Sequence, residues 1–149
     1  MTKHIGMSGI RTVISHKRDE ILNVLPEDVI NKAFAADEEL IIAKEAQIFI
    51  KQNIDGAMHD ASEGGIFAAL WDMAEYSGTG LDIDLRHISV KQEIIEICEL
   101  FNINPYILDS MGCLLMTCEN GCDIVNIMKQ NGIEAAGMKI LNSLMSGDT

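Results

Sequence analysis

The stretch Met58-His59-Asp60-Ala61-Ser62-Glu63-Gly64-Gly65-Ile66 decides how this chain of 149 residues folds. A short, partly apolar segment at 56–59 is typical of the buried end of a strand. The polar turn after it leads into a helix predicted over 63–77, where apolar residues recur on one face. Asp60 and Ser62 are residue types that cap helix N-termini. We therefore expect a strand–turn–helix unit at the centre of the fold.

The two glycines of this turn, Gly64 and Gly65, indicate more than a helix cap. Glycine inside a helix costs about 1 kcal/mol relative to alanine, so two in succession suggest that side chains are excluded. One reason is that an anion such as phosphate approaches the free N–H groups of the helix start, next to Ser62 and Glu63. The alternative is a capped helix whose glycines pack against a neighbouring strand.

His59 and Asp60 precede the turn and are candidate catalytic residues. An imidazole and a carboxylate side by side can act as a base, as a proton shuttle or as metal ligands. The alternative is a hydrogen-bonded pair at the end of a strand.

A second candidate anion contact lies at the start of the chain. Lys3 and His4 stand beside Gly6 and Gly9, which combines cationic side chains with an accessible backbone. The alternative is a solvated N-terminus without a ligand.

The rest of the chain alternates between helical stripes and short apolar segments. Further helices are expected after a Ser8 cap, from Pro26 at a first position, and over 36–50, 90–101 and 121–130, with a short helical turn at Pro105. Strands are expected over 81–85, 113–118 and 135–141. No linker-like tract divides the chain, so we predict a single α/β (α+β) domain over 1–149, with a sheet covered by helices.

The charge balance restricts the partners. The net charge is −12, with 23 acidic and 11 basic residues, so nucleic acid is excluded as a partner. The same excess opposes the steering of phosphate, and backbone N–H groups or a metal must attract any bound anion. The apolar runs are too short for a membrane span. No signal peptide is recognisable, and we expect a cytoplasmic protein.

The four cysteines, Cys98, Cys113, Cys118 and Cys122, are expected to be buried thiols in a reducing compartment. A metal site made by the last three is the alternative. Their spacing, Cys-x4-Cys-x3-Cys, matches no common zinc motif, and we predict no metal site in this chain.

The stretch at 58–65 resembles the Met-His-Asp-x-Thr-Glu-Gly-Gly motif in the C-terminal domain of the aminoimidazole-ribonucleotide (AIR) synthetase and HypE superfamily. The greatest similarity is to the AIR synthase-related, or HypE-like, proteins. Further stretches match family patterns in the same order: Thr2–Gly9, Ala43–Ala46, Gly80–Asp84, Ile97–Pro105 and Ser110–Leu115. Ser62 replaces the threonine of the motif and keeps its hydroxyl.

The resemblance implies a layered α/β/α domain with a mixed sheet, similar to the C-terminal domain of AIR synthetase. In the full-length family enzyme, ATP and Mg²⁺ are held mainly by an N-terminal ATP-binding domain, which also forms the homodimer. The C-terminal domain closes the cleft, and its glycine-containing helix start contributes to binding a phosphorylated or nucleotide small molecule. The resemblance adds hydrogenase maturation to the functions to be considered.

The N-terminal ATP-binding domain is absent from this chain, and we expect the isolated domain to be inactive. A start at the family's domain boundary favours a domain cut from a longer protein over a natural split subunit. The functional alternative is a non-catalytic assembly or ligand-binding module that retains the fold.

Overall fold

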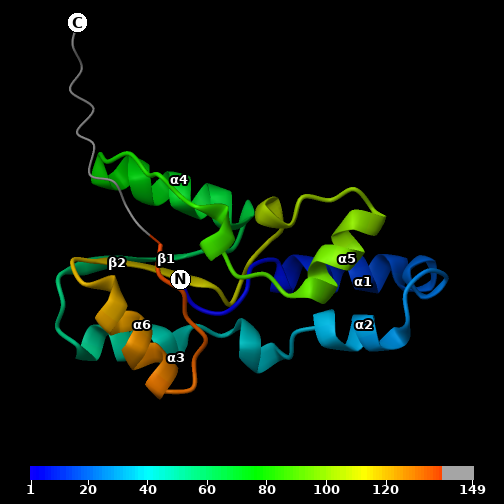
Figure 1. Ribbon diagram of the computed structural model, residues 1–149, viewed down its shortest axis with the longest axis horizontal. Coiled ribbons are helices and arrows are strands. Elements are labelled where there is room, and N and C mark those ends of the chain that lie inside the picture. Colours follow the sequence, from blue (N-terminus) through cyan, green and yellow to red (C-terminus); the bar gives the residue numbers. More distant parts are fainter. Residues whose placement is uncertain (139–149) are drawn as a thin grey trace, which may run out of the picture.

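The stretch at the centre of the sequence folds as strand β1 (Gly56–Asp60), a turn, and helix α4 (Gly65–Ser77). The computed structural model describes residues 1–138 (Figure 1). The other elements are α1 (Met7–Leu22), α2 (Glu27–Ala33), the 3-10 helix η1 (Asp37–Leu40), α3 (Ala43–Lys51), η2 (Leu85–His87), α5 (Gln92–Leu100), η3 (Pro105–Ile107), β2 (Leu114–Cys118) and α6 (Gly121–Gln130).

The sheet is built around β2. Strand β1 pairs with it antiparallel, so that His59 lies opposite Leu115. Beyond β2, the Thr2 N–H donates to the Leu114 carbonyl over 3.0 Å, and Thr2 forms an antiparallel bridge with Ala135. The strand pairs within residues 1–138 are all antiparallel, so the mixed sheet that the resemblance implies is not seen in this part of the chain.

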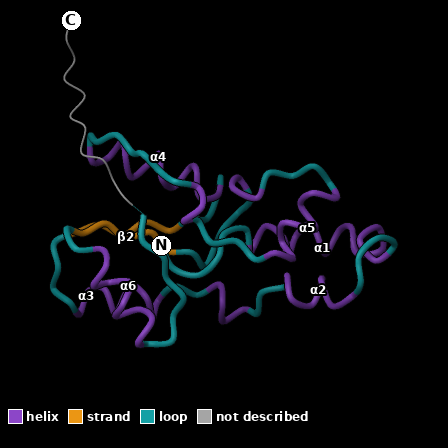
Figure 2. Tube along the Cα trace, viewed as in Figure 1, coloured by secondary structure: helices purple, strands orange, loops and turns teal. Residues whose placement is uncertain are grey.

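Helices cover both faces of this sheet. Helix α4 lies on one face, and α3 and α6 lie on the other (Figures 1 and 2). Neighbouring residues of β2 point to opposite faces: Leu115 packs in the core beneath α4, and Met116 packs against the core formed by α3 and α6. The predicted α/β class and its α/β/α layering are confirmed.

Beside the sheet, α1, α2 and α5 form a helical cluster with its own core, at the right in Figure 1. Ile10, Ile94 and Ile97 are fully buried there. The apolar stripe predicted over 90–101 therefore faces α1 and α2.

The predicted helix over 36–50 is wrong in its first half. The structure has η1, then an extended Ile41, and then α3. The Glu39 and Ile41 carbonyls accept hydrogen bonds from Lys3 Nζ at 2.9 and 2.8 Å. This contact with a distant residue satisfies two carbonyls where a continuous helix would have used its own N–H groups.

The predicted strand over 81–85 is also absent. Residues 81–84 have no ladder partner within the described chain. Leu81 and Ile83 pack on the core beneath α4, whereas Asp82 is exposed. The alternation therefore reflects one buried face and not a paired strand. In the strand predicted over 135–141, Ala135 forms its bridge, and 139–141 lie outside the described residues.

Two helix starts and one burial expectation need correction. Helix α1 begins at Met7 behind Gly6, whose φ is +73°, and Ser8 lies inside the first turn instead of capping it. Pro26 is the N-cap of α2 and not its first residue. The segment at 56–59 is a strand, but residues 56–58 are exposed because β1 pairs on one side only in the described chain.

Candidate functional site

The turn from Asp60 to Gly65 reverses the chain between β1 and α4. Gly64 and Gly65 have φ values of +79° and +69°, a region that residues with a side chain rarely enter. The Gly65 N–H donates to the Ser62 carbonyl over 3.1 Å. The glycines therefore form the tight turn itself, and α4 starts directly behind it.

The two glycines differ in their surroundings. A Cβ on Gly65 would lie 2.6 Å from both the Tyr106 and the Leu108 carbonyl oxygens. Close packing against η3 thus accounts for this glycine. A Cβ on Gly64 would meet only the Ala68 Cβ within 4 Å, at 2.7 Å. The backbone at Gly64 is accessible from outside the helix.

The start of α4 offers donors for an anion. The first N–H groups of a helix have no partner within it, and the helix dipole adds partial positive charge there. Within residues 1–138, the N–H groups of Glu63 and Gly64 make no backbone hydrogen bond. The arrangement can bind phosphate or a carboxylate through the main chain.

His59 and Asp60 lie beside this turn. His59 is half-buried; its Nδ1 is 2.6 Å from the Asp60 carbonyl oxygen, and its Nε2 is 3.5 Å from Asp72 Oδ2 on α4. Asp60 Oδ1 is buried and has no hydrogen-bond partner within the described residues. Since a buried carboxylate oxygen normally has a partner, Asp60 can accept a proton donor or a cation supplied by a ligand.

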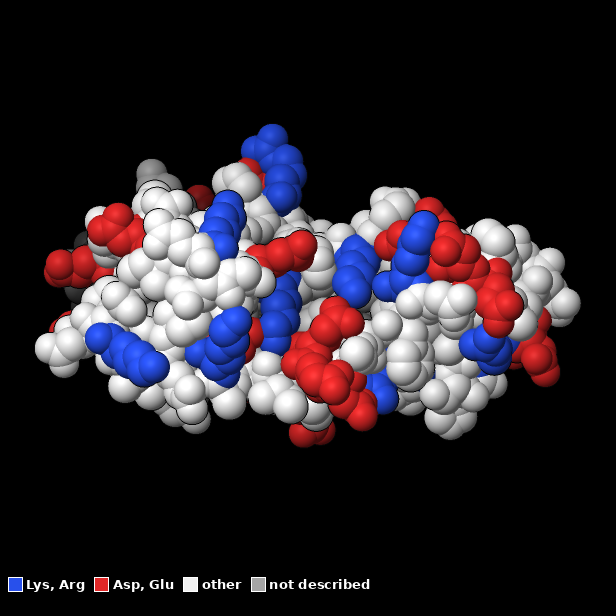
Figure 3. All heavy atoms as spheres, turned by 90° about the horizontal axis from the view of Figure 1, so that it is seen from below, with Lys and Arg blue, Asp and Glu red and all other residues white. Residues whose placement is uncertain are grey.

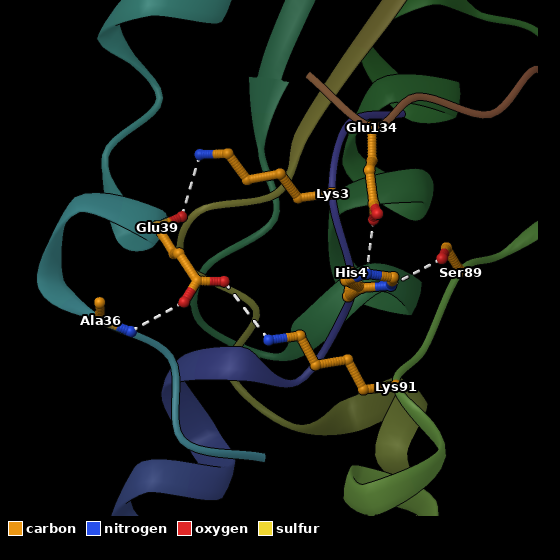
Figure 4. A network of polar contacts seen from close by, with 7 residues as sticks. All are labelled: Lys3, His4, Ala36, Glu39, Ser89, Lys91 and Glu134. Carbon is orange, nitrogen blue, oxygen red and sulfur yellow. Dashed lines mark hydrogen bonds and ion pairs between the residues drawn. The ribbon is translucent and has the colours of Figure 1, made fainter. Parts of the chain in front are cut away.

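The side chain of Lys3 is used internally. Its ammonium contacts Glu45 Oε1 at 2.6 Å in addition to the Glu39 and Ile41 carbonyls. Glu45 is only 2% exposed. The three N–H groups of Lys3 therefore each have an acceptor, and the residue joins the chain start to η1 and α3. Figure 4 shows the contact with Glu39.

His4 lies in a separate polar network on the same segment. Its ring lies between Ser89 and Glu134, whereas Lys91 and Lys3 approach Glu39 nearby (Figure 4). This network involves 89–91 and 134, and none of its contacts reaches the 60–65 turn.

Ser110 links Gly6 to the start of α4, and Gly9 packs beside it against residue 109. The Gly6 N–H donates to Ser110 Oγ over 2.8 Å, and the Ser110 N–H donates to the Ser62 carbonyl over 3.2 Å. Gly9 packs against Asp109, whose nitrogen would lie 3.0 Å from an added Cβ. Ser110 itself is fully buried. The only sequence signal for it is its place in the matched stretch 110–115.

The buried thiols are unreactive in character. Burial raises the pKa of Cys113 to about 12 and that of Cys98 to about 11. Cys122 is exposed. Within residues 1–138, no three His, Cys, Asp or Glu side chains gather as a metal site.

On the face shown in Figure 3, Lys and Arg side chains are spread out, with acidic side chains among them. None of the helices described is both long and apolar enough to cross a membrane.

A family model, the C-terminal domain of AIR synthase-related proteins, matches residues 2–137. The chain is 28% identical over 115 residues to a putative hydrogenase expression/formation protein of Methanocaldococcus jannaschii, and the match covers 76% of this chain and 31% of that protein. It is 30% identical over 60 residues to the carbamoyl dehydratase HypE of Rhodobacter capsulatus, covering 40% and 18%. The chain thus spans under a third of these relatives.

Solved structures share the fold. Escherichia coli HypE, a hydrogenase maturation protein, superposes with a TM-score of 0.72 at 19% identity, over 94% of this chain and 42% of that one. HypE in a HypE–HypF complex gives a TM-score of 0.64 at 21% identity, over 95% and 45%.

Proposed function

This chain belongs to the AIR synthase-related protein family, as its C-terminal domain, and from that premise we propose that it is the substrate-closing half of an ATP-dependent, HypE-like enzyme. The start of α4 binds a phosphate group of the substrate or nucleotide through Ser62, Gly64 and Gly65. His59 and Asp60 orient that group or accept a proton. Alone, the domain is inactive in this ATP-dependent reaction, because it supplies only one wall of that active site.

The open backbone at Gly64 carries this proposal. Gly64 combines a positive φ, a neighbourhood empty but for Ala68, and an N–H without a backbone partner. Packing against Tyr106 and Leu108 accounts for Gly65, whereas the positive φ and the close Ala68 Cβ account for the lack of a side chain at Gly64. Neither accounts for the exposed Gly64 N–H without a backbone partner in the described chain, and a ligand that contacts the main chain at the helix start would use it.

ATP and Mg²⁺ belong mainly to the ATP-binding domain in this proposal. The described residues of this chain offer no cluster of three metal ligands. Asp60 Oδ1, buried without a partner, is one acceptor that could face a cation held by the other half. The full-length protein is proposed to form a homodimer through its ATP-binding domain.

The enzymatic role is tested by ATP hydrolysis. The chain is produced joined to an AIR synthetase-type ATP-binding domain encoded with it, and alone as the comparison. We expect nucleotide binding and turnover by the two-domain protein only. If the two-domain protein binds no nucleotide, the enzyme role is wrong and the domain is a non-catalytic binding module.

The phosphate site is tested separately on the isolated chain. Inorganic phosphate is titrated while backbone amide resonances are followed by NMR. We expect the amides of Glu63, Gly64 and Ile66 to shift, and Gly64→Ala to weaken binding. Gly78→Ala is the matched control, since Gly78 has φ +63° at the other end of α4 with nothing within 4 Å of an added Cβ. If the amide resonances at the start of α4 do not shift, the proposed phosphate site is wrong. The test of ATP hydrolysis is independent of that result.

A further inference from the structure

A set of three residues that lies apart from the start of α4 has the arrangement of a nucleophile, a base and an acid. Ser89 Oγ lies 2.7 Å from His4 Nδ1, and His4 Nε2 lies 2.6 Å from Glu134 Oε2 (Figure 4). A serine becomes nucleophilic when a base can take its proton and a third group orients that base. We propose that Ser89, His4 and Glu134 form a second site, which cleaves small carboxylic esters with Ser89 as the nucleophile.

The main chain fixes the spacing of these three residues. The Ile5 N–H donates to the Ser89 carbonyl over 2.9 Å, and the Lys3 N–H donates to the Glu134 carbonyl over 2.8 Å. The residues on either side of His4 therefore bind the backbones of its two partners. Only the side-chain rotamers of the three residues remain free, and this favours a stable arrangement of the three side chains.

The hydroxyl of Ser89 is directed away from the core. Ile88 is 4% exposed, and Val90 packs against two core clusters. Since neighbouring residues of an extended segment point to opposite sides, Ser89 faces outward. It lines a hollow of about 380 Å³ together with Glu134 and Lys129, which is large enough for a small acyl group.

The hydrogen-bond directions suit a base. Glu134 Oε2 can only accept, so His4 Nε2 carries the ring proton, and His4 Nδ1 accepts from the Ser89 hydroxyl. In this tautomer, Nδ1 is the ring nitrogen that can take the serine proton. Lys129 is one of the residues that line the same hollow, and its side chain is the cation that would stabilise a developing oxyanion.

The chemistry proceeds in two steps. Ser89 Oγ bonds to the acyl carbon while its proton moves to His4 Nδ1. The ester C–O bond then breaks, and the leaving alkoxide takes that proton. A water molecule, deprotonated by His4, attacks the acyl-serine, so that the carboxylic acid and the Ser89 hydroxyl are released. Glu134 is a positioning residue throughout.

Diisopropyl fluorophosphate tests this nucleophile on the purified chain. The Ser89 oxygen should displace fluoride from phosphorus, and trypsin should place the adduct on the peptide 87–91, whose single serine is Ser89. Turnover of 4-nitrophenyl acetate is followed in parallel. We expect Ser89→Ala to abolish the adduct and the catalysed turnover, and His4→Gln to slow labelling by about 100-fold or more.

Conservative variants separate positioning from folding. Glu134→Gln should slow labelling, and Glu134→Asp should restore part of the rate, with circular dichroism confirming that each variant is folded. Ser77→Ala is the control, because the Ser77 hydroxyl bonds to the Met73 carbonyl and has no base beside it. An unlabelled Ser89 in folded protein, or equal labelling rates in His4→Gln and the unmodified chain, would overturn the assignment. Neither readout involves ATP or the α4 start.

Discussion

The hydroxyl oxygen of Ser110 accepts a hydrogen bond from the Gly6 N–H over 2.8 Å and so joins segments 104 residues apart. The same residue donates its own N–H to the carbonyls of Ala61 and Ser62 at 3.1 and 3.2 Å. Its hydroxyl also donates to the Leu108 carbonyl over 2.9 Å. Through one buried side chain, the start of α1 is held in place relative to the turn that opens α4.

Ser110→Ala should therefore destabilise the whole domain. The Gly6 N–H would be left buried without its partner, which costs about 1–3 kcal/mol. For a domain of this size, thermal denaturation should show a midpoint lower by about 2–4 °C for each kcal/mol. Ser77→Ala, at an exposed helix end, should change stability by less than about 0.5 kcal/mol. Equal midpoints for the two variants would contradict the structural role of Ser110.

Replacing glycine by alanine should lower the stability of the domain by different amounts at the two ends of α4. Gly65→Ala combines φ +69° with a Cβ 2.6 Å from the Tyr106 oxygen of η3 and from the Leu108 oxygen directly after it, whereas Gly78→Ala, at φ +63°, meets open space. The positive φ costs about 1–2 kcal/mol at either position, and displacing η3 should add about 1–3 kcal/mol at Gly65 alone. Urea denaturation measures both. If Gly65→Ala were no worse than Gly78→Ala, packing would not explain this glycine.

Sequence periodicity predicts the helices well where local signals agree. Helix α6 occupies the predicted range 121–130 and ends before Gly132, whose φ is +75°. Pro105 opens η3 at its first position, as expected. In both cases an apolar stripe or a backbone restriction within a few residues determines the outcome.

The failures come from contacts that no local pattern encodes. The helix predicted over 36–50 is interrupted between η1 and α3. There, Lys3 donates hydrogen bonds to the carbonyls of two residues that follow it by 36 and 38 positions in the sequence. In the alternating segment 81–85, Leu81 and Ile83 pack on the core without a strand beside them in the described chain, and Leu85 is exposed. At the candidate site, the glycines are recognisable from the sequence, whereas the roles of Ser110 and of the Ser89–His4 pair are not, because each joins segments more than 80 residues apart.

The buried ion pair between Lys3 and Glu45 should be sensitive to the loss of either partner. Lys3→Met leaves a carboxylate that is 2% exposed without its cation and two carbonyls without a donor. Breaking such a pair costs about 3–5 kcal/mol. Lys32→Met removes the exposed pair with Asp28, whose attraction is screened by water, and should leave the stability nearly unchanged. Chemical denaturation that ranks these two variants equally would contradict the internal role of Lys3.

The buried thiol of Cys113 should make the domain sensitive to alkali. Burial raises its pKa from 9.0 to about 12, so the unfolded chain loses this proton at lower pH than the folded one. The stability contributed by the protonated thiol is complete below about pH 9 and is lost as the pH rises toward about 12, at about 1.4 kcal/mol per pH unit.

Cys113→Ala isolates this effect from other groups that titrate in alkali. At pH 8 the variant should be less stable than the unmodified chain, because a buried side chain is truncated. Between pH 8 and pH 10.5 that difference in unfolding free energy should narrow, since only the unmodified chain carries the thiol. For Cys122→Ala, at an exposed position, the difference in unfolding free energy from the unmodified chain should stay constant over the same pH range. A constant difference for Cys113→Ala would mean that its thiol ionises alike in the folded and unfolded states, against the burial that the structure gives it.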